Sequence, residues 1–367
     1  MSAALRDQRA ARLRKAMAQA GMDVLLVAGD AWRSDYIRYA IDVTPMEGLA
    51  IAVIDRSGAT RVFVDNPVEA RRIAAEQPQL EVSWSPSPIT QANAAVAAVA
   101  ADRLGLAPVH VLPQRLARRA SSDGLAKTTQ MLDALMVRKS GEEADAVQRA
   151  VTLADDGYAV FRRAARAGRR EYEVVADLEA WFRAQGCPEN FMIMGSGQQE
   201  VRSMHPPGER ILQVGDLVTT ELTPCVDGYY AQICRTLVLG QPTPAQLKSH
   251  AVYVEAMDAG IAQVRPGATQ GEVAKALNDV FRRHGLGEYI TSAYTRVRGH
   301  GLGLYVDGPH VLEDVKLVLE PNMTLIVHPN TYHPDAGYIV LGDAVRVTQT
   351  GCEVLTRTPR ELFATPA

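Results

Sequence analysis

The first 136 residues alternate between short apolar segments and longer mixed ones. Segments 23–29, 48–55 and 60–65 are apolar runs bounded by Gly, Asp or Ser, which is typical of strands. An Ala-rich segment over 91–104 is expected to be a helix, and a short strand (VHVLP) and another helix near 124–134 are expected to follow it. The pattern predicts an α/β domain over 1–136.

Beyond that domain the pattern changes to long helices with recognisable start signals. Ser140 with Glu143, and Thr269 with Glu272, fit the capping box in which side chain and backbone bond reciprocally. Predicted strands follow each pair of helices, so the order helix, helix, strands occurs twice. We expect a second domain over 137–367 with two similar halves packed about a common sheet.

One stretch of this second domain, GDLVTTELTPCVDGYYAQICRTLVLG, alternates as two strands and a turn would. It carries Glu221 and Gln232, eleven residues apart. Further polar side chains come from other predicted strands: His205, His300, His328 and Asp343. A buried histidine in an apolar strand needs a polar partner, so a satisfied core histidine is the alternative to a functional one for His300 and His328.

Composition narrows the function classes. The net charge is -3, hydrophobic residues make up 47% of the chain, and no apolar run is long enough for a membrane span. The charge gives no reason to expect nucleic acid or a membrane as partner. Four cysteines without a CxxC pair suit a reducing compartment. We expect a cytoplasmic protein that acts on a small molecule.

Five motifs in order resemble the pita-bread family, the M24 peptidase and creatinase family that includes methionine aminopeptidase, aminopeptidase P, prolidase and creatinase. They are VRKSGEEADAVQRA, HPPGERILQVGDLV, DGYYAQICRT, GHGLGLYVDGP and LEPNMTLIVHPN. The resemblance covers 138–355 well, and the N-terminal domain looks like that of prolidases and creatinase. It implies an α/β N-terminal domain plus an α+β pita-bread C-terminal domain, with two pseudo-symmetric halves around a curved antiparallel sheet.

The resemblance also implies a place for metal. Metalloenzymes of the family bind two ions with Asp, Asp, His, Glu and Glu, and the matching positions here hold Glu221, Gln232, His300, His328 and Gly342. The second and last ligands bridge the ions, which an amide and a glycine cannot do. Two dications about 4 Å apart repel strongly without bridging carboxylates. We therefore expect a degenerate dinuclear site.

The first functional hypothesis is a metal-independent, creatinase-like hydrolase that cleaves a C–N bond in a small nitrogenous substrate. His205 would serve as general base and acid, because its unperturbed pKa lies near neutrality. Glu221 and His328 complete the predicted catalytic set, and Gln232 and His300 would bind the substrate. No cofactor is expected under this hypothesis.

Two alternatives remain open at this point. A mononuclear metalloenzyme could use Glu221, His300 and His328 as ligands for Zn, Fe or Mn. A non-catalytic descendant of a peptidase could bind a peptide or a partner protein.

The positions that handle substrate in the family are also changed. Glu47 and Val311 stand where creatinase has arginines, so creatine is not the expected substrate. Asp307 and Arg296 replace histidines that family peptidases use, which makes ordinary X-Pro cleavage an improbable activity; Arg296 and Arg298 could instead hold an anion. We predict substrate contacts from Glu47, Arg296 and Asp307, and a homodimer, as is common in the family.

Overall fold

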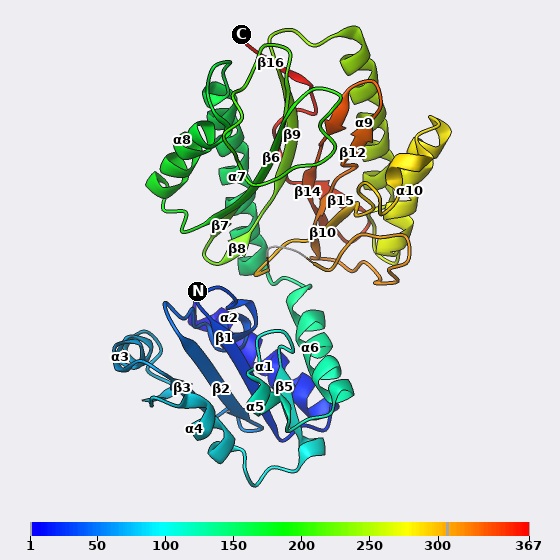
Figure 1. Ribbon diagram of the computed structural model, residues 1–367. Helices are drawn as coiled ribbons and strands as arrows, with labels where there is room; N and C mark the ends of the chain where they lie inside the picture. Colours follow the sequence, from blue (N-terminus) through cyan, green and yellow to red (C-terminus); the bar gives the residue numbers. More distant parts are fainter. Residues whose placement is uncertain (1, 306–307, 367) are drawn as a thin grey trace. The chain divides into compact units, whose positions relative to one another are not determined.

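The computed structural model describes residues 2–305 and 308–366, and the chain divides into two compact units, Met1–Met136 and Val137–Ala367 (Figure 1). Among the described residues, no helix is both long and apolar enough to cross a membrane.

The first unit is a mixed sheet with strand order β4-β3-β2-β1-β5 and helices packed on it. Strand β1 pairs antiparallel with β2 and parallel with β5. The strands are β1 (Val24–Asp30), β2 (Leu49–Asp55), β3 (Thr60–Val64), β4 (Glu81–Trp84) and β5 (Leu104–Ala107). The helices are α1 (Ala3–Gln19), α2 (Asp35–Ile41), α3 (Pro67–Glu76), α4 (Pro88–Ala95), α5 (Gln114–Ala117) and α6 (Ser122–Met136), with the short 3-10 helix η1 (Ala101–Arg103).

The prediction for the middle of this unit was wrong. The expected helix over 91–104 ends at Ala95, and residues 104–107 form β5, whereas the expected strand over 109–113 is a turn. Leu104 and Leu106 are buried where β5 pairs with β1. Pairing with a buried strand outweighs the helix propensity of an Ala-rich sequence.

Within its described residues, the second unit contains four long helices: α7 (Gly141–Ala164), α8 (Glu171–Ala184), α9 (Pro244–Gln263) and α10 (Gln270–Arg283). The capping boxes predicted at Ser140 and Thr269 are confirmed, since each side chain accepts a hydrogen bond from the backbone of the glutamate three residues later. The predicted helix starts are therefore correct.

In the described part of the second unit, two larger sheets lie between these helix pairs, and β12 and β13 form a small separate one (Figure 1). The first has the order β16-β9-β7-β6, with β8 paired to β7; the second has the order β10-β11-β14-β15, and β12 pairs with β13. The pairs are antiparallel except that β16 runs parallel to β9. The strands are β6 (Asn190–Gly197), β7 (Leu217–Val226), β8 (Tyr229–Tyr230), β9 (Ile233–Leu239), β10 (Gly299–Gly301), β11 (Thr324–Val327), β12 (Thr331–His333), β13 (Gly337–Ile339), β14 (Asp343–Val347), β15 (Cys352–Val354) and β16 (Phe363–Thr365), and η2 (Gly287–Ile290) is a 3-10 helix.

Each helix pair covers one sheet. Tyr158 of α7 and Leu178 of α8 pack with β7 and β9, while Met257 of α9 and Phe281 of α10 pack with β11 and β14. An isolated bridge between Cys234 and Gly342 joins the two halves. The predicted architecture, an α/β domain plus a pita-bread domain with two similar halves, is confirmed.

Candidate active site

Strand register places two predicted ligand positions, Glu221 and Gly342, around the bridge that joins the halves. Glu221 of β7 lies opposite Cys234 of β9, and Cys234 lies opposite Gly342. Directly opposed residues of antiparallel strands project to the same face of a sheet. Glu221 and Cys234 therefore project together, next to a position that has no side chain.

A buried hydrogen-bonded group surrounds Glu221. Gln232 Nε2 donates to Glu221 Oε2 at 3.3 Å and to Thr223 Oγ1 at 3.2 Å, and Asn330 Nδ2 donates to Glu221 Oε1 at 2.7 Å. On its other side, Gln232 Oε1 lies 3.1 Å from His300 Nε2. We call Glu221, Gln232, His300 and Asn330 the Glu221 cluster. Its amide links a carboxylate to an imidazole.

His300 has carbonyl oxygens near both ring nitrogens. Nδ1 lies 2.9 Å from Gly301 O, and Nε2 faces the Gln232 carbonyl oxygen. Both contacts are satisfied when His300 carries a proton on each ring nitrogen. Gln232 then accepts from the imidazole and donates to the carboxylate, which the family's aspartate could not do.

His328 lies beside this cluster, with its ring centroid 6.1 Å from that of His300. Burial, and after it the charges of His300 and Arg298, hold the pKa of His328 well below its usual range. Its Nδ1 is buried without a hydrogen-bond partner among the described residues. The structure thus places a neutral imidazole with an unsatisfied nitrogen next to the cluster.

The space beside Gly342 is filled by Cys234. A Cβ added at Gly342 would lie 2.7 Å from Cys234 Sγ, 2.9 Å from Cys234 Cβ and 3.1 Å from His328 Cβ. Burial, followed by the negative charge of Glu221, raises the pKa of the Cys234 thiol well above its usual range. A neutral thiol therefore occupies the room that a side chain at position 342 would need.

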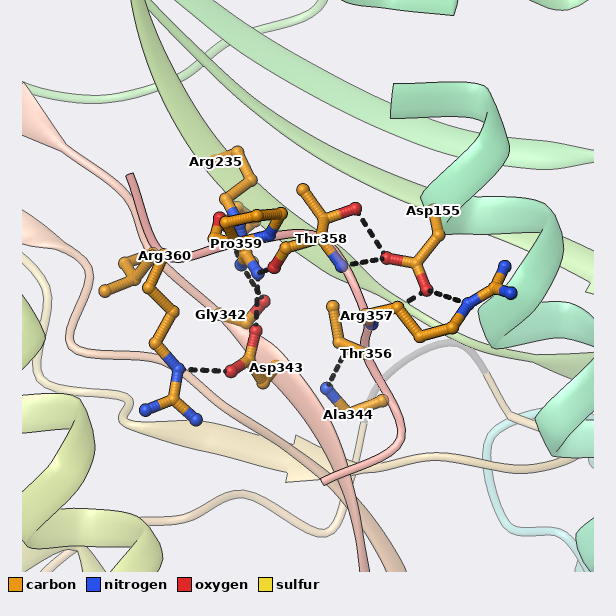
Figure 2. Close-up of polar contacts among 12 residues, drawn as sticks. Asp155, Arg235, Gly342, Asp343, Ala344, Thr356, Arg357, Thr358, Pro359 and Arg360 are labelled. Carbon is orange, nitrogen blue, oxygen red and sulfur yellow. Dashed lines mark hydrogen bonds and ion pairs between the residues drawn. The ribbon is translucent and has the colours of Figure 1, made fainter. Parts of the chain in front are cut away.

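Arg235 holds the backbone on both sides of the bridge (Figure 2). Its Nη1 donates to Cys234 O at 2.9 Å and to Gly342 O at 2.7 Å, while Nη2 pairs with Asp343 Oδ1 at 2.7 Å. Nη2 and Nε also donate to Thr358 O and Pro359 O. Asp343, a candidate site residue from the sequence, is thereby engaged in a structural pair.

The C-terminal segment 356–360 completes this network, as Figure 2 shows. Asp155 of α7 accepts hydrogen bonds from Arg357 N, Thr358 N and Thr358 Oγ1, and Arg360 Nε donates to Asp343 Oδ2 at 2.6 Å. We call Arg235, Asp343, Arg360, Thr358 and Asp155 the Arg235 network. Through Arg235, the residue that follows Cys234 in β9, this network holds the backbone carbonyls of both bridge residues.

His205 lies on the loop that follows β6, and its backbone pairs with Met194. Its side chain is 49% exposed, with Nδ1 2.7 Å from Pro206 O and 3.8 Å from the buried Glu171 carboxylate. Glu171 accepts from Gly208 N on the same loop. His205 is therefore positioned and accessible, but no hydrogen bond that we describe joins it to the Glu221 cluster.

Arg296 and Glu47, two further predicted substrate contacts, each pair with another residue of their own unit. Arg296 is half exposed and paired with Asp314 at 3.0 Å, so its charge is already matched. Glu47 lies in the first unit, where it accepts a hydrogen bond from Asn66. Arg298 is fully buried, points to Asn278 of α10 at 2.6 Å, and has its pKa lowered to about 10 by burial. Asp307 lies outside the described residues.

Sequence reasoning missed three residues of the site. Asn330 follows His328 by two positions in the motif that carried the resemblance, so its amide could have been included. Cys234 and Arg235 were not predicted to have roles, because their partners Gly342 and Asp343 lie more than 100 residues later in the chain.

Comparisons with known proteins identify the relatives of this chain. A model of metallopeptidase family M24 matches residues 145–349, more than half of the chain. The uncharacterized peptidase YqhT of Bacillus subtilis is 27% identical over 362 residues, covering 96% of this chain and 98% of the relative. An Xaa-Pro dipeptidase of Pyrococcus furiosus is 27% identical over 240 residues, covering 65% and 68%.

Solved structures match along the whole length. Dipeptidase PepE from Mycobacterium ulcerans is 26% identical with a TM-score of 0.83, and the match covers 100% of both chains. The prolidase from Pyrococcus horikoshii is 22% identical with a TM-score of 0.81 over 97% of this chain and 99% of that one, which shows the shared fold.

The residues present do not fit the pair of metal ions that the resemblance implies. Gln232 contributes an uncharged amide already bonded to Glu221 and His300, and Gly342 has neither a side chain nor room for one. Among the described residues, no group of three or more His, Cys, Asp or Glu side chains is arranged to hold a metal ion.

The prediction of a metal-independent, creatinase-like hydrolase is wrong. The matching family is one of metallopeptidases, and relatives such as PepE are dipeptidases by name. That prediction was based on a few altered ligand positions, whereas the similarity to dipeptidase PepE covers the whole chain. The broader prediction of a hydrolase is confirmed at the level of the family. The chain belongs to metallopeptidase family M24.

Proposed function

We propose that this chain hydrolyses the peptide bond of dipeptides. The observation that supports this most directly is the end-to-end match to dipeptidase PepE, which extends through both units. The Glu221 cluster lies at the positions that the family resemblance marks as functional. Dipeptides are small molecules, in agreement with the small-molecule substrate expected from the composition of the chain.

Within this proposal, Glu221, His300 and His328 form the buried part of the active site and His205 the accessible part. Gln232 links Glu221 and His300, so the three side chains act as one unit. Removing one member of such a buried group leaves the others with unpaired polar atoms. His205 contacts the substrate from the exposed loop.

We also propose that the metal centre of this chain holds fewer ions than the family's two-ion centre. The support is local: an uncharged amide at Gln232, a thiol in the space beside Gly342, and at position 328 a histidine where the resemblance places an anionic glutamate. A homodimer and a cytoplasmic location remain proposals from the sequence.

The test is a substrate panel measured with metal content. Purified protein is offered Xaa-Pro dipeptides, other dipeptides, tripeptides and creatine, with and without added Mn²⁺, Co²⁺ or Zn²⁺, and metal per chain is measured on the same samples. We expect cleavage of dipeptides and clearly fewer than two ions per chain. Absence of dipeptide cleavage under every condition would overturn the dipeptidase proposal. Two ions per chain would overturn the proposal that the centre holds fewer ions than the family's.

Gln232→Ala sharpens the test. We expect kcat/KM for the best dipeptide to fall about 100-fold or more, because the link between the carboxylate and the imidazole is lost. Glu76→Gln is the control: Glu76 is an exposed residue of the first unit that pairs with Arg72, and its loss should leave kcat/KM unchanged. Near-wild-type activity in Gln232→Ala would show that the Glu221 cluster does not serve catalysis.

A further inference from the structure

A buried arginine, Arg298, is joined to the Glu221 cluster by hydrogen bonds. Arg298 Nη1 donates to Asn330 O at 2.9 Å, and Asn330 Nδ2 donates to Glu221 Oε1 at 2.7 Å. Arg298 is 0% exposed, so it can act on a substrate only through other residues. Asn330 is the single residue between the guanidinium and the Glu221 carboxylate on this path.

Asn330 is held at three of its polar groups, which fixes the direction of its amide. Its backbone oxygen accepts from Arg298, its Oδ1 accepts from Leu341 N at 3.0 Å, and its Nδ2 donates to Glu221. A backbone N–H can only donate and an ionised carboxylate can only accept, so the two ends of the amide cannot exchange. The Glu221 carboxylate is therefore held where Asn330 places its amide nitrogen.

A second element, helix α10, also holds the guanidinium. Arg298 Nε donates to Asn278 Oδ1 at 2.6 Å, and the guanidinium carbon lies 5.6 Å from the Phe281 ring centroid. Asn278 is fixed in turn, because its Nδ2 donates to Glu313 Oε1 at 2.6 Å. Packing and hydrogen bonds therefore lock the guanidinium in place before any substrate binds, as the support of a reactive group requires.

The backbone of Arg298 is connected to the two histidines of the site. Arg298 precedes His300 by two residues, and His328 N donates to Arg298 O at 3.1 Å. This bond continues the antiparallel pairing in which Gly299 lies opposite Val327. One residue is thus connected to Glu221 through its side chain and to both histidines through its backbone.

The charge of Arg298 is not paired with a carboxylate among the described residues. Its hydrogen bonds go to the Asn278 amide and to backbone carbonyl oxygens, and within the described part of the chain its Nη2 is buried with no partner. Burying a charge in this way is costly, whereas Arg235 of the same unit is paired with Asp343. Such a cost calls for an explanation, and support of a reactive group is one.

We propose that Arg298 is a positioning residue: by holding Asn330, it keeps the Glu221 carboxylate in the orientation that hydrolysis of a dipeptide needs. The inference rests on the proposed function, in which Glu221 belongs to the active site. Displacement of a reactive group by about 1 Å can lower a rate about 100-fold. Loss of the Arg298 guanidinium should therefore slow the reaction, although this side chain is buried away from solvent.

Steady-state kinetics of Arg298→Met test this role, because Met fills much of the same space but has no donor. With the best dipeptide we expect kcat to fall between about tenfold and 100-fold while KM changes less than about threefold, since the orientation of Glu221 matters most in the transition state. Arg298→Lys keeps a donor for Asn330 O and should recover part of the loss. Arg283→Gln is the matched control, because Arg283 is an exposed arginine of α10 paired with Glu255. An unchanged kcat, or a rise in KM alone, would overturn the proposal.

A double-mutant cycle shows whether Arg298 acts through Asn330. Rates are taken per folded chain, measured by circular dichroism on the same samples, so that a loss of stability does not count as a loss of kcat. Arg298→Met combined with Asn330→Ala should lower kcat no further than Asn330→Ala alone, because both changes break the same path. Losses that multiply in the double variant would show an independent effect of Arg298 and would contradict the positioning role.

A crystal structure of Arg298→Met separates this proposal from the proposed function, and Arg298→Gln takes its place if the first variant does not fold. We expect Asn330 Nδ2 to leave hydrogen-bond distance of Glu221 Oε1, whether or not the chain cleaves dipeptides. An Asn330 amide that keeps its contact with Glu221 would overturn the positioning role even in an active dipeptidase. A displaced amide in a chain that cleaves no dipeptide would support the positioning of Glu221 and overturn the dipeptidase proposal alone.

Discussion

The Glu221 cluster and the Arg235 network are both buried polar groups, and they meet at the bridge between Cys234 and Gly342. All three nitrogens of the Arg235 guanidinium donate to oxygens, and its charge is matched by Asp343. Beside the Glu221 cluster, by contrast, His328 Nδ1 has no partner among the described residues. Natural proteins satisfy nearly all buried polar atoms, so each exception calls for an explanation, such as a bound water or ion or a catalytic role. The first group holds the fold and the second is available for chemistry.

The largest effect is expected from Asp343→Asn. This change leaves the fully buried Arg235 without its carboxylate, and breaking a buried pair from one side costs about 3 to 5 kcal/mol in free energy of unfolding. Urea denaturation of the whole chain measures the loss. Asp314→Asn breaks the exposed pair with Arg296 and should cost less than about 1 kcal/mol. Similar losses in both variants would mean that the network is not what holds the bridge.

The sequence predicted more of the fold than of the site. Capping residues such as Ser140 and Thr269 act within one helical turn, so their effect can be seen locally. The error over 91–104 came from β5, whose partner strand lies about 80 residues earlier. The site depends on still longer separations, since Asn330 bonds Glu221 across 109 residues. Resemblance to a family marked positions 221, 232, 300 and 328, but not the thiol that fills the space beside Gly342.

An intermediate effect is expected from pH, through His250 of α9. Burial, and after it the charge of Arg235, lowers the pKa of His250 to about 4. The unfolded chain binds this proton near pH 6.5 and the folded chain does not, so stability falls as the pH drops from about 6.5 towards 4. The contribution lost at pH 5 is about 2 kcal/mol. His250→Gln removes it.

Denaturation of wild type and His250→Gln at pH 7.5 and pH 5 gives the measurement. The loss between the two pH values should be about 2 kcal/mol smaller in the variant. His284→Gln is the control, because His284 is an exposed histidine that pairs with Glu255 and is not buried as His250 is. Equal pH dependence in wild type and His250→Gln would place the buried proton-linked group elsewhere.

The smallest effect tests the boundary between the two groups. Gly342→Ala puts a methyl group 2.7 Å from Cys234 Sγ, and such overpacking costs about 1 to 3 kcal/mol in free energy of unfolding. Cys234→Ala removes the sulfur but keeps the Cβ at 2.9 Å, so the double variant should recover only part of this loss. Gly351→Ala is the control, because an added Cβ there meets nothing within 4 Å. Urea denaturation of both single variants and the double variant yields the coupling free energy, which we expect to be about 1 kcal/mol. Losses that add within about 0.4 kcal/mol would show that Cys234 does not define the space at Gly342. The proposal of fewer metal ions would then rest on Gln232 and His328 alone.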